Sequence, residues 1–384
     1  MIAGGDGGAL LAGVKVVDLT SVVFGPYCTQ ILADLGAEVI KVEAPPHGDI
    51  FRNAGKPAKT RGMGPGFIAI NRGKQSVMLD LKSPEGAAQM RALIGEADVF
   101  VLNVRGKAAE RLGLDYEQVR AIRPDIIYLH CVGFGQDGPY ADRPAYDDVI
   151  QAASGTTSLL SRVDGNPAAR YLPSLIADKV SGLHGAYAVM AALIHRMRTG
   201  EGQRVEVPMF EAFTSFMLVE HLGGLTFDPP NAPVCYARQV DPHRQPFKTA
   251  DGYISIAAYT DRDWLPLFTV LGNPGFLDAP DLATPADRFA ALPRLYAEVT
   301  RLALGFKTAD LVERCAAANL PAQPARDIGT IMTDAHLAAT GFFRRREHPS
   351  EGGYYEMRHP VRFGAVPLAE PGLPPLPGEH GASD

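Results

Sequence analysis

A carboxylate at the start of a long predicted helix is the first candidate for chemistry. Asp178 begins a helical pattern over 178–198, which Thr199-Gly200 closes. An aspartate there can act as an N-cap, because its side chain accepts hydrogen bonds from the free N–H groups of the first turn. The same position also suits a nucleophile, since a helix N-terminus favours an ionised carboxylate. Position alone favours the cap.

Two histidines and several basic residues extend the list of candidate groups. His130 and His184 are possible general bases, although a single histidine in a strand or helix is more often a packed core residue. A phosphate-bearing ligand requires a basic patch. The residues that could form one are Lys41, Lys74, Lys82, Arg105, Lys107 and Arg111. Solvated surface charge is an equally good interpretation of these positions.

A glycine-rich segment at 133–139, with the sequence GFGQDGP, resembles a turn that brings backbone N–H groups together. Such segments are more often simple strand-to-loop turns. GxGxxG does not follow the first predicted strand, and P-loop, HExxH and GxSxG patterns do not occur. These absences argue against a nicotinamide dehydrogenase and a serine hydrolase.

Strands and helices alternate through the first part of the chain. A strand over 13–19, a break at Gly25-Pro26, a helix over 27–35 and a strand over 37–43 make a βαβ unit. The alternation then continues with strands over 76–81, 97–102 and 125–132 and helices over 84–95 and 116–122. The stretch 47–66 is expected to be a long surface loop. The pattern predicts an α/β fold with a Rossmann-like parallel sheet.

A composition shift at 227–233 marks a domain boundary. We expect a large α/β domain over 1–225 and a smaller α+β domain over 226–335, which includes a strand over 251–258. A C-terminal segment over 336–384 is expected to return to the large domain, with an extended Pro- and Gly-rich arm beyond Pro367.

Composition narrows the class of protein. The 384 residues are 46% hydrophobic and 21% charged, as in a globular enzyme. Residues 1–11 lack the features of a signal peptide, and no apolar run is long enough to cross a membrane. The four scattered cysteines form no CxxC pair, which fits reduced thiols in the cytoplasm and no metal site. The net charge of −6 argues against nucleic acid or an anionic membrane as a partner.

Several segments together resemble the family III coenzyme A transferases, a group that includes formyl-CoA and carnitine CoA-transferases and the related α-methylacyl-CoA racemases. Each motif is loose alone, but their order and spacing are specific. The segments are 18–26 (DLTSVVFGP), 30–43, 71–76, 79–82, Asn103, 111–114, 133–139, 146–155, Asp178, 199–203, 209–211 and 250–254.

The resemblance implies a reaction, a site and an assembly. Asp178 would attack an acyl-CoA thioester to give a mixed anhydride and then an aspartyl-CoA thioester, from which an acceptor acid takes coenzyme A. Tyr146 matches an active-site tyrosine. A ring-shaped subunit in an interlocked homodimer is also implied. The positions that match coenzyme A contacts are Val22, Val23, Leu79, Lys82, Asn103, Val104, Arg111 and Met209.

Departures from the family pattern leave the substrates open. Relatives often have an aromatic residue where this chain has Val104, and some have a basic residue where it has Ala44. The glycine-rich loop of formyl-CoA transferase has no clear copy at 241–246, which weakens an assignment to oxalate or formate. A dicarboxylic substrate is suggested by charge alone. The residues that could bind its second carboxylate are Arg143, Arg170, His243 and Arg244.

Two alternatives to a transferase remain at this point. The first is a racemase, but racemase relatives have a histidine at the position of Tyr146, and a tyrosine is a poor base at neutral pH. The second is a non-catalytic acyl-CoA-binding subunit, which the presence of Asp178 argues against.

Overall fold

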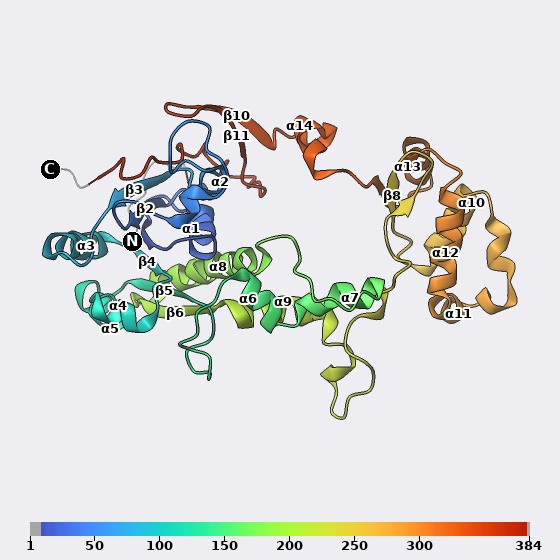
Figure 1. The fold of residues 1–384 in the computed structure, drawn as a ribbon, viewed down its shortest axis with the longest axis horizontal. Coiled ribbons are helices and arrows are strands. Elements are labelled where there is room, and N and C mark those ends of the chain that lie inside the picture. Colours follow the sequence, from blue (N-terminus) through green and yellow to red (C-terminus); the bar gives the residue numbers. More distant parts are fainter. Residues whose placement is uncertain (1–8, 382–384) are drawn as a thin grey trace. The chain divides into compact units, whose positions relative to one another are not determined.

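The computed structural model describes residues 9–381 (Figure 1). Most of residues 1–11, which were expected not to be a signal peptide, lies outside this range. The described chain forms two compact units. The first comprises residues up to Thr157, Tyr171–Val219 and the chain from Thr340 onward, and the second comprises Ser158–Arg170 and Glu220–Ala339.

A six-stranded parallel sheet forms the centre of the first unit, which confirms the predicted α/β fold. The strands follow the order β3-β2-β1-β4-β5-β6. Successive strands are added toward one edge of the sheet up to β3 and toward the other edge from β4 onward, so the strand order switches between β1 and β4. Doubly wound folds bind ligands at such a switch point, at the carboxyl ends of the strands. The strand bounds are β1 (Lys15–Leu19), β2 (Glu38–Glu43), β3 (Lys74–Met78), β4 (Val99–Leu102), β5 (Ile127–Val132) and β6 (Gln203–Pro208).

Helices cover both faces of this sheet, so its central strands are buried on both sides. Val16 of β1 belongs to the core beneath α1 (Phe24–Asp34) and α8 (Ile176–Thr199). Val17 points into the opposite core with α3 (Pro84–Glu96) and α5 (Tyr116–Ile122). This alternation explains the continuous apolar runs in the sequence.

Helices α1 and α8 pack closely against each other (Figure 1). A Cβ atom at Gly182 would lie 2.9 Å from the carbonyl oxygen of Phe24, and one at Gly185 would lie 3.0 Å from the Sγ of Cys28. These two glycines of α8 therefore allow the close approach of the two helices.

Two local expectations were wrong. The helix expected from residue 27, after a break at Gly25-Pro26, instead begins at Phe24 and includes both residues, because a proline in the first turn needs no N–H partner. The stretch 47–66 is not wholly surface, since Arg52 is fully buried there in a short 3-10 helix, Ile50–Asn53.

The remaining elements of the first unit surround the sheet. The two strands β10 (Phe343–His348) and β11 (Gly352–Met357) form an antiparallel hairpin. Beyond Pro367 the described chain has neither helix nor strand, and His380 N–H donates to the Ser76 carbonyl beside β3 (2.9 Å). The other helices here are α2 (Pro65–Ile70), α4 (Gly106–Arg111), α6 (Asp147–Ala153) and α9 (Met209–His221), of which α9 ends in the second unit.

The second unit combines a small antiparallel sheet with helices. Its three strands follow the order β7-β8-β9, with bounds β7 (Phe247–Lys248), β8 (Tyr253–Ile256) and β9 (Ala322–Pro324). Its core contains Trp264, Phe268 and Leu295. Its helices are α7 (Leu159–Asp164), α10 (Trp264–Val270), α11 (Pro285–Ala290), α12 (Leu292–Ala303), α13 (Thr308–Ala317) and α14 (Ala335–Ala339). In the described part of the chain, no helix is long and apolar enough to cross a membrane.

Candidate active site

A cavity of about 210 Å³ opens where the strand order switches, between β1 and β4. Ser21 and Val22 after β1, Asn103 after β4 and His130 near the end of β5 line it. The carboxyl ends of parallel strands meet at one edge of a sheet, so these loops converge there. Asp178 and Met209 complete the lining within the first unit.

The loop after β1 has an unusual backbone that its neighbours hold in place. Val22 has a φ of 73°, in the left-handed region that β-branched residues rarely adopt. Its N–H donates to Oδ1 of Asp49 (3.0 Å). The side chain of Asn103 accepts from the N–H of Ser21 (3.2 Å) and donates to its carbonyl (2.9 Å). Such strain persists only where the surroundings fix it, as here at the wall of a cavity.

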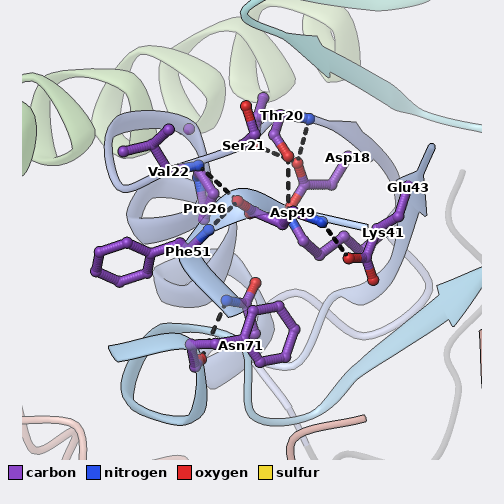
Figure 2. A network of polar contacts seen from close by, with 12 residues as sticks. Asp18, Thr20, Ser21, Val22, Pro26, Lys41, Glu43, Asp49, Phe51 and Asn71 are labelled. Carbon is purple, nitrogen blue, oxygen red and sulfur yellow. Dashed lines mark hydrogen bonds and ion pairs between the residues drawn. The ribbon is translucent and has the colours of Figure 1, made fainter. Parts of the chain in front are cut away.

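A buried network of charges supports this loop (Figure 2). Lys41 forms an ion pair with Asp49 (3.0 Å) and donates to the Thr20 carbonyl (2.8 Å). Asp18 pairs with Lys74 (3.2 Å) and accepts a hydrogen bond from the Thr20 hydroxyl. Burial opposes ionisation of Asp18, but these cations and hydroxyls lower its pKa to about 2. Lys41 and Lys74 are therefore buried structural residues, and the expectation that they belong to a basic surface patch was wrong.

Asp178 is not the N-cap of α8. The helix begins at Ile176, so Asp178 is its third residue, and the N-cap position is held by Leu175, which makes no side-chain capping bond. The Asp178 N–H donates instead to Oδ2 of Asp147 (3.0 Å). Asp178 is 5% exposed and lines the cavity, and its carboxylate has no hydrogen-bond or ion-pair partner among residues 9–381. A buried carboxylate without a structural partner is available for chemistry.

The surroundings of Asp178 disfavour its ionised form. Burial raises its pKa to about 7, with further contributions from the negative charges of Asp147 and Asp148. Burial and these two like charges act against the helix N-terminus, which favours the ionised carboxylate.

The side chains of Asp147 and Gln151 hold the segment that leads into α8. Both lie in the segment 146–155, but neither was assigned a role from the sequence. Asp147 Oδ1 accepts from Gln151 Nε2 (2.6 Å). Gln151 Oε1 accepts from the Leu172 N–H (2.9 Å), and its Nε2 donates to the Ser174 carbonyl (3.1 Å). The spacing of four residues within a helix was the available signal.

Tyr146 and His130 are two other candidate groups that lie at the cavity. Tyr146 is the N-cap residue of α6 and exposes 60% of its surface beside the cavity. His130 is buried at the cavity, and its Nε2 lies 2.9 Å from the Val104 carbonyl oxygen. Burial lowers the pKa of His130, so it is neutral at pH 7 and its Nε2–H donates to Val104. His184 contacts Tyr187 on α8 and does not line the cavity.

The cavity brings together part of the predicted site. Tyr146 and Asp178 line it, as do four of the eight positions predicted to contact coenzyme A: Val22, Asn103, Val104 and Met209. The other four do not. Val23 is buried at the start of α1, Leu79 is buried just after β3, and Lys82 and Arg111 are exposed. Since β3 is parallel to β1, Leu79 and Lys82 follow a strand end at the same sheet edge.

The glycine-rich turn at 133–139 does not present a row of consecutive free backbone N–H groups. The Gly135 N–H donates to Oε1 of Glu211 (3.0 Å), and the Gln136 N–H donates to Oε1 of Glu206 (2.9 Å). These bonds fix the loop that leads from β5 to Tyr146. Its role in the structure is to position side chains at the cavity.

Cys131 lines the cavity, but burial raises the pKa of its thiol well above the usual value, so it stays protonated. Within residues 9–381, no group of three or more His, Cys, Asp and Glu side chains is arranged to hold a metal ion. Asp178 therefore remains the candidate nucleophile of the cavity.

A doubly wound parallel sheet with a ligand cavity at its switch point defines an α/β enzyme fold, and sequence comparison gives the family. The model of CoA-transferase family III matches residues 11–381. The chain belongs to this family. A succinate–glutarate CoA-transferase of Agrobacterium fabrum is 34% identical over 97% of this chain and 94% of the relative. A protein of Mycobacterium tuberculosis named probable fatty acyl-CoA transferase is 34% identical over 97% of this chain and 96% of its own.

Solved structures agree with this membership. A CAIB/BAIF family protein from Brucella suis superposes with a TM-score of 0.82 at 32% identity, covering 97% of both chains. A crystal structure of the Mycobacterium tuberculosis relative superposes with a TM-score of 0.83 at 30% identity, covering 98% of both chains. The fold is thus shared over nearly the whole chain.

Proposed function

We propose that this protein transfers coenzyme A from an acyl-CoA thioester to a free carboxylic acid through covalent intermediates on Asp178. The observation that carries the proposal is the Asp178 carboxylate, which lines the cavity and has no partner among the described residues. In a chain of CoA-transferase family III, such a carboxylate fits the role of the nucleophile.

Four exchanges account for the transfer. An oxygen of Asp178 attacks the donor thioester carbonyl, the C–O bond forms, the C–S bond breaks, and the thiolate of coenzyme A leaves. The thiolate then attacks the Asp178 carbonyl carbon of this anhydride, giving an aspartyl-CoA thioester and the free donor acid. The acceptor carboxylate attacks the same carbon and releases the thiolate again. Attack of the thiolate on the acceptor acyl carbon yields the new thioester and restores Asp178.

The raised pKa of Asp178 suits this chemistry. At about 7, the carboxylate is ionised in a large fraction of molecules at neutral pH and is more basic than an ordinary aspartate. The environment that destabilises the negative charge on Asp178 also favours its consumption in a neutral anhydride or thioester. A buried, poorly solvated carboxylate is in this sense a better nucleophile than an exposed one.

Coenzyme A is larger than the cavity, so only its reacting end fits there. Pockets that enclose whole ligands usually measure about 300–1,000 Å³, against about 210 Å³ here. We assign Val22, Asn103, Val104 and Met209 to the thioester end. Val23, Leu79, Lys82 and Arg111, outside the cavity, are assigned to the remainder of coenzyme A.

A homodimer is part of the proposal. Apolar side chains are exposed along α8 and α9, among them Tyr187 (56%), Met197 (68%) and Val219 (84%). An apolar groove of about 930 Å³ runs beside α1 and α8. Large exposed apolar patches mark association surfaces. Light scattering should give twice the chain mass, and Tyr187→Asp should shift the protein toward the monomer; a parent of single-chain mass would refute the dimer.

Intact-mass spectrometry tests the covalent mechanism. The protein is mixed with a panel of acyl-CoA thioesters, with Asp178→Asn and the neighbouring Asp148→Asn in parallel. A CoA-sized or acyl-sized adduct on the parent and Asp148→Asn, absent from Asp178→Asn, supports the proposal. Absence of any adduct on the parent would contradict it. Exchange of the α-proton in deuterated water, without an acceptor acid, would then indicate a racemase.

A further inference from the structure

The four residues that could bind a second carboxylate have different surroundings within their own units. Arg170 is already engaged by both oxygens of Asp164, at 2.7 Å each. Arg244 donates to Gln239 (2.7 Å) in the second unit. Of the four candidates, Arg143 is the one that lines the cavity with Asp178.

The guanidinium of Arg143 stacks on the ring of Tyr140, which in turn packs against core aromatic residues. Its Cζ lies 4.0 Å from the ring centroid of Tyr140. The ring of Tyr140 packs edge-on against Phe134 (5.5 Å between centroids), and Phe134 packs against Phe210 (5.5 Å). Phe134 is buried in the main core. A guanidinium stacked on a fixed ring loses less side-chain entropy when it binds an anion.

The charge of Arg143 is not neutralised by another side chain in the described part of the protein. Among residues 9–381, no carboxylate lies within ion-pair distance of Arg143. The neighbouring acid, Asp142, is engaged by Lys107 (2.8 Å). The loop itself is fixed, because the Arg143 N–H donates to the Tyr140 carbonyl (2.9 Å). A fixed cation without a counter-ion therefore lines the same cavity as the nucleophile.

We propose that Arg143 binds the second carboxylate of a dicarboxylic acid whose first carboxyl group reacts at Asp178, an inference that rests on the proposed function. A planar guanidinium pairs with a carboxylate through two parallel hydrogen bonds, which a monocarboxylic acid of the same length cannot use. The names of the relatives include both dicarboxylate and fatty acyl substrates, so the class must be assigned from this chain's own residues. Arg143 selects dicarboxylic acids over fatty acids.

Arg105 is the competing cation. It lines the same cavity and has no carboxylate within ion-pair distance among the described residues. However, it directly follows Asn103 and Val104, which we assign to coenzyme A. Arg143 lies three residues before Tyr146, on the loop whose end contacts the Asp178 backbone through Asp147. We therefore assign the acid to Arg143.

A competition experiment on the aspartyl-CoA form tests the assignment. The adduct is prepared with an acyl-CoA thioester, freed of excess donor and exposed to equal concentrations of glutarate and valerate. The ratio of glutaryl-CoA to valeryl-CoA gives the ratio of the two kcat/KM values, independently of the donor. The parent should favour glutarate. Arg143→Met should lower the ratio roughly 10- to 100-fold, the usual effect of removing a hydrogen bond to a charged group.

Three further variants sharpen the result. Arg143→Lys should recover part of the ratio, because lysine restores the positive charge but not the two parallel N–H donors of the guanidinium. Arg244→Met should keep the parent's ratio, because that guanidinium is already bound to Gln239 within the second unit. An unchanged ratio in Arg143→Met, or a collapse in Arg105→Met alone, would overturn the assignment while leaving transfer intact. Failure of the parent to form any adduct would instead overturn the proposed function, and this inference with it.

Discussion

The backbone N–H of Asp178 donates a hydrogen bond to the side-chain Oδ2 of Asp147 at 3.0 Å. One carboxylate thus satisfies a free N–H in the first turn of α8 and places a negative charge beside a second carboxylate. The first effect positions Asp178, and the second raises its pKa. Asp147 thus contributes to both the position of the proposed nucleophile and, after burial, to its raised pKa.

Replacing Asp147 should change the pH dependence of adduct formation. Asp178 must be ionised to attack, so the rate should rise with pH around a midpoint near its pKa of about 7. Asp147→Asn removes a like charge, which favours the ionised form, so the midpoint should move to lower pH by ~1 unit. Burial, the largest cause of the shift, remains, so the midpoint should stay above the ordinary aspartate value. Stopped reactions analysed by intact mass at several pH values measure it.

Asp148 provides the matched control. It is a weaker contributor to the same pKa shift and makes no hydrogen bond to the Asp178 backbone. Asp148→Asn should therefore move the midpoint less than Asp147→Asn. If Asp147→Asn lowered thermal stability but left the midpoint in place, its role would be structural only.

The buried charge of Asp178 should cost stability at neutral pH. A folded-state pKa of about 7 against 3.8 means that the folded protein binds more protons between these values, so stability falls as pH rises through this window. The full effect is about 4 kcal/mol above pH 7. Asp178→Asn lacks this titration. The free energy of unfolding of Asp178→Asn, measured in urea, should therefore exceed that of the parent by more at pH 8 than at pH 5. An equal difference at both pH values would contradict the raised pKa.

Sequence patterns predicted the sheet better than the site. Apolar runs such as 97–102 and 125–132 mark strands buried on both faces, and they correspond to β4 and β5. The predicted sheet lacked its last strand, β6. The sequence pattern of β6 is weaker, because its side chains are mostly only partly buried. Local periodicity reports burial, and an edge strand has less of it.

The site could be named by resemblance but not assembled from spacing. Lys41 and Lys74 look like surface lysines in the sequence, and only the fold brings them to Asp49 and Asp18 in the interior. Asp147 is 31 residues from Asp178 along the chain, so their hydrogen bond has no local signature. Long-range pairing of polar groups is set by topology, which the periodicity of a single sequence does not encode.

Gly25 should be intolerant of a side chain. A Cβ atom there would lie 2.4 Å from the side chain of Thr20, whose hydroxyl is held by Asp18. Gly25→Ala should therefore lower the free energy of unfolding by about 1–3 kcal/mol, despite the higher helix propensity of alanine. The displaced loop should also weaken coenzyme A binding, measurable by calorimetry.

A second helical glycine provides the control for Gly25. At Gly95 in α3 the nearest atom would lie 3.9 Å from an added Cβ. Gly95→Ala should be neutral or stabilise the protein by roughly 0.5–1 kcal/mol. Equal effects of the two substitutions in chemical denaturation would show that the contact with Thr20 is not decisive.

The charge network beneath the Val22 loop should be sensitive to loss of one partner. Lys74 pairs with Asp18, and Lys74→Met would leave that carboxylate buried without its nearest cation. Removing one member of a buried pair typically costs about 3–5 kcal/mol. The pKa of Asp18, now about 2, should rise, so the loss of stability should be greatest at neutral pH and shrink as acid protonates Asp18. Lys107→Met, which breaks the exposed pair with Asp142, should leave urea unfolding unchanged at either pH; a comparable loss there would show that burial does not set the cost.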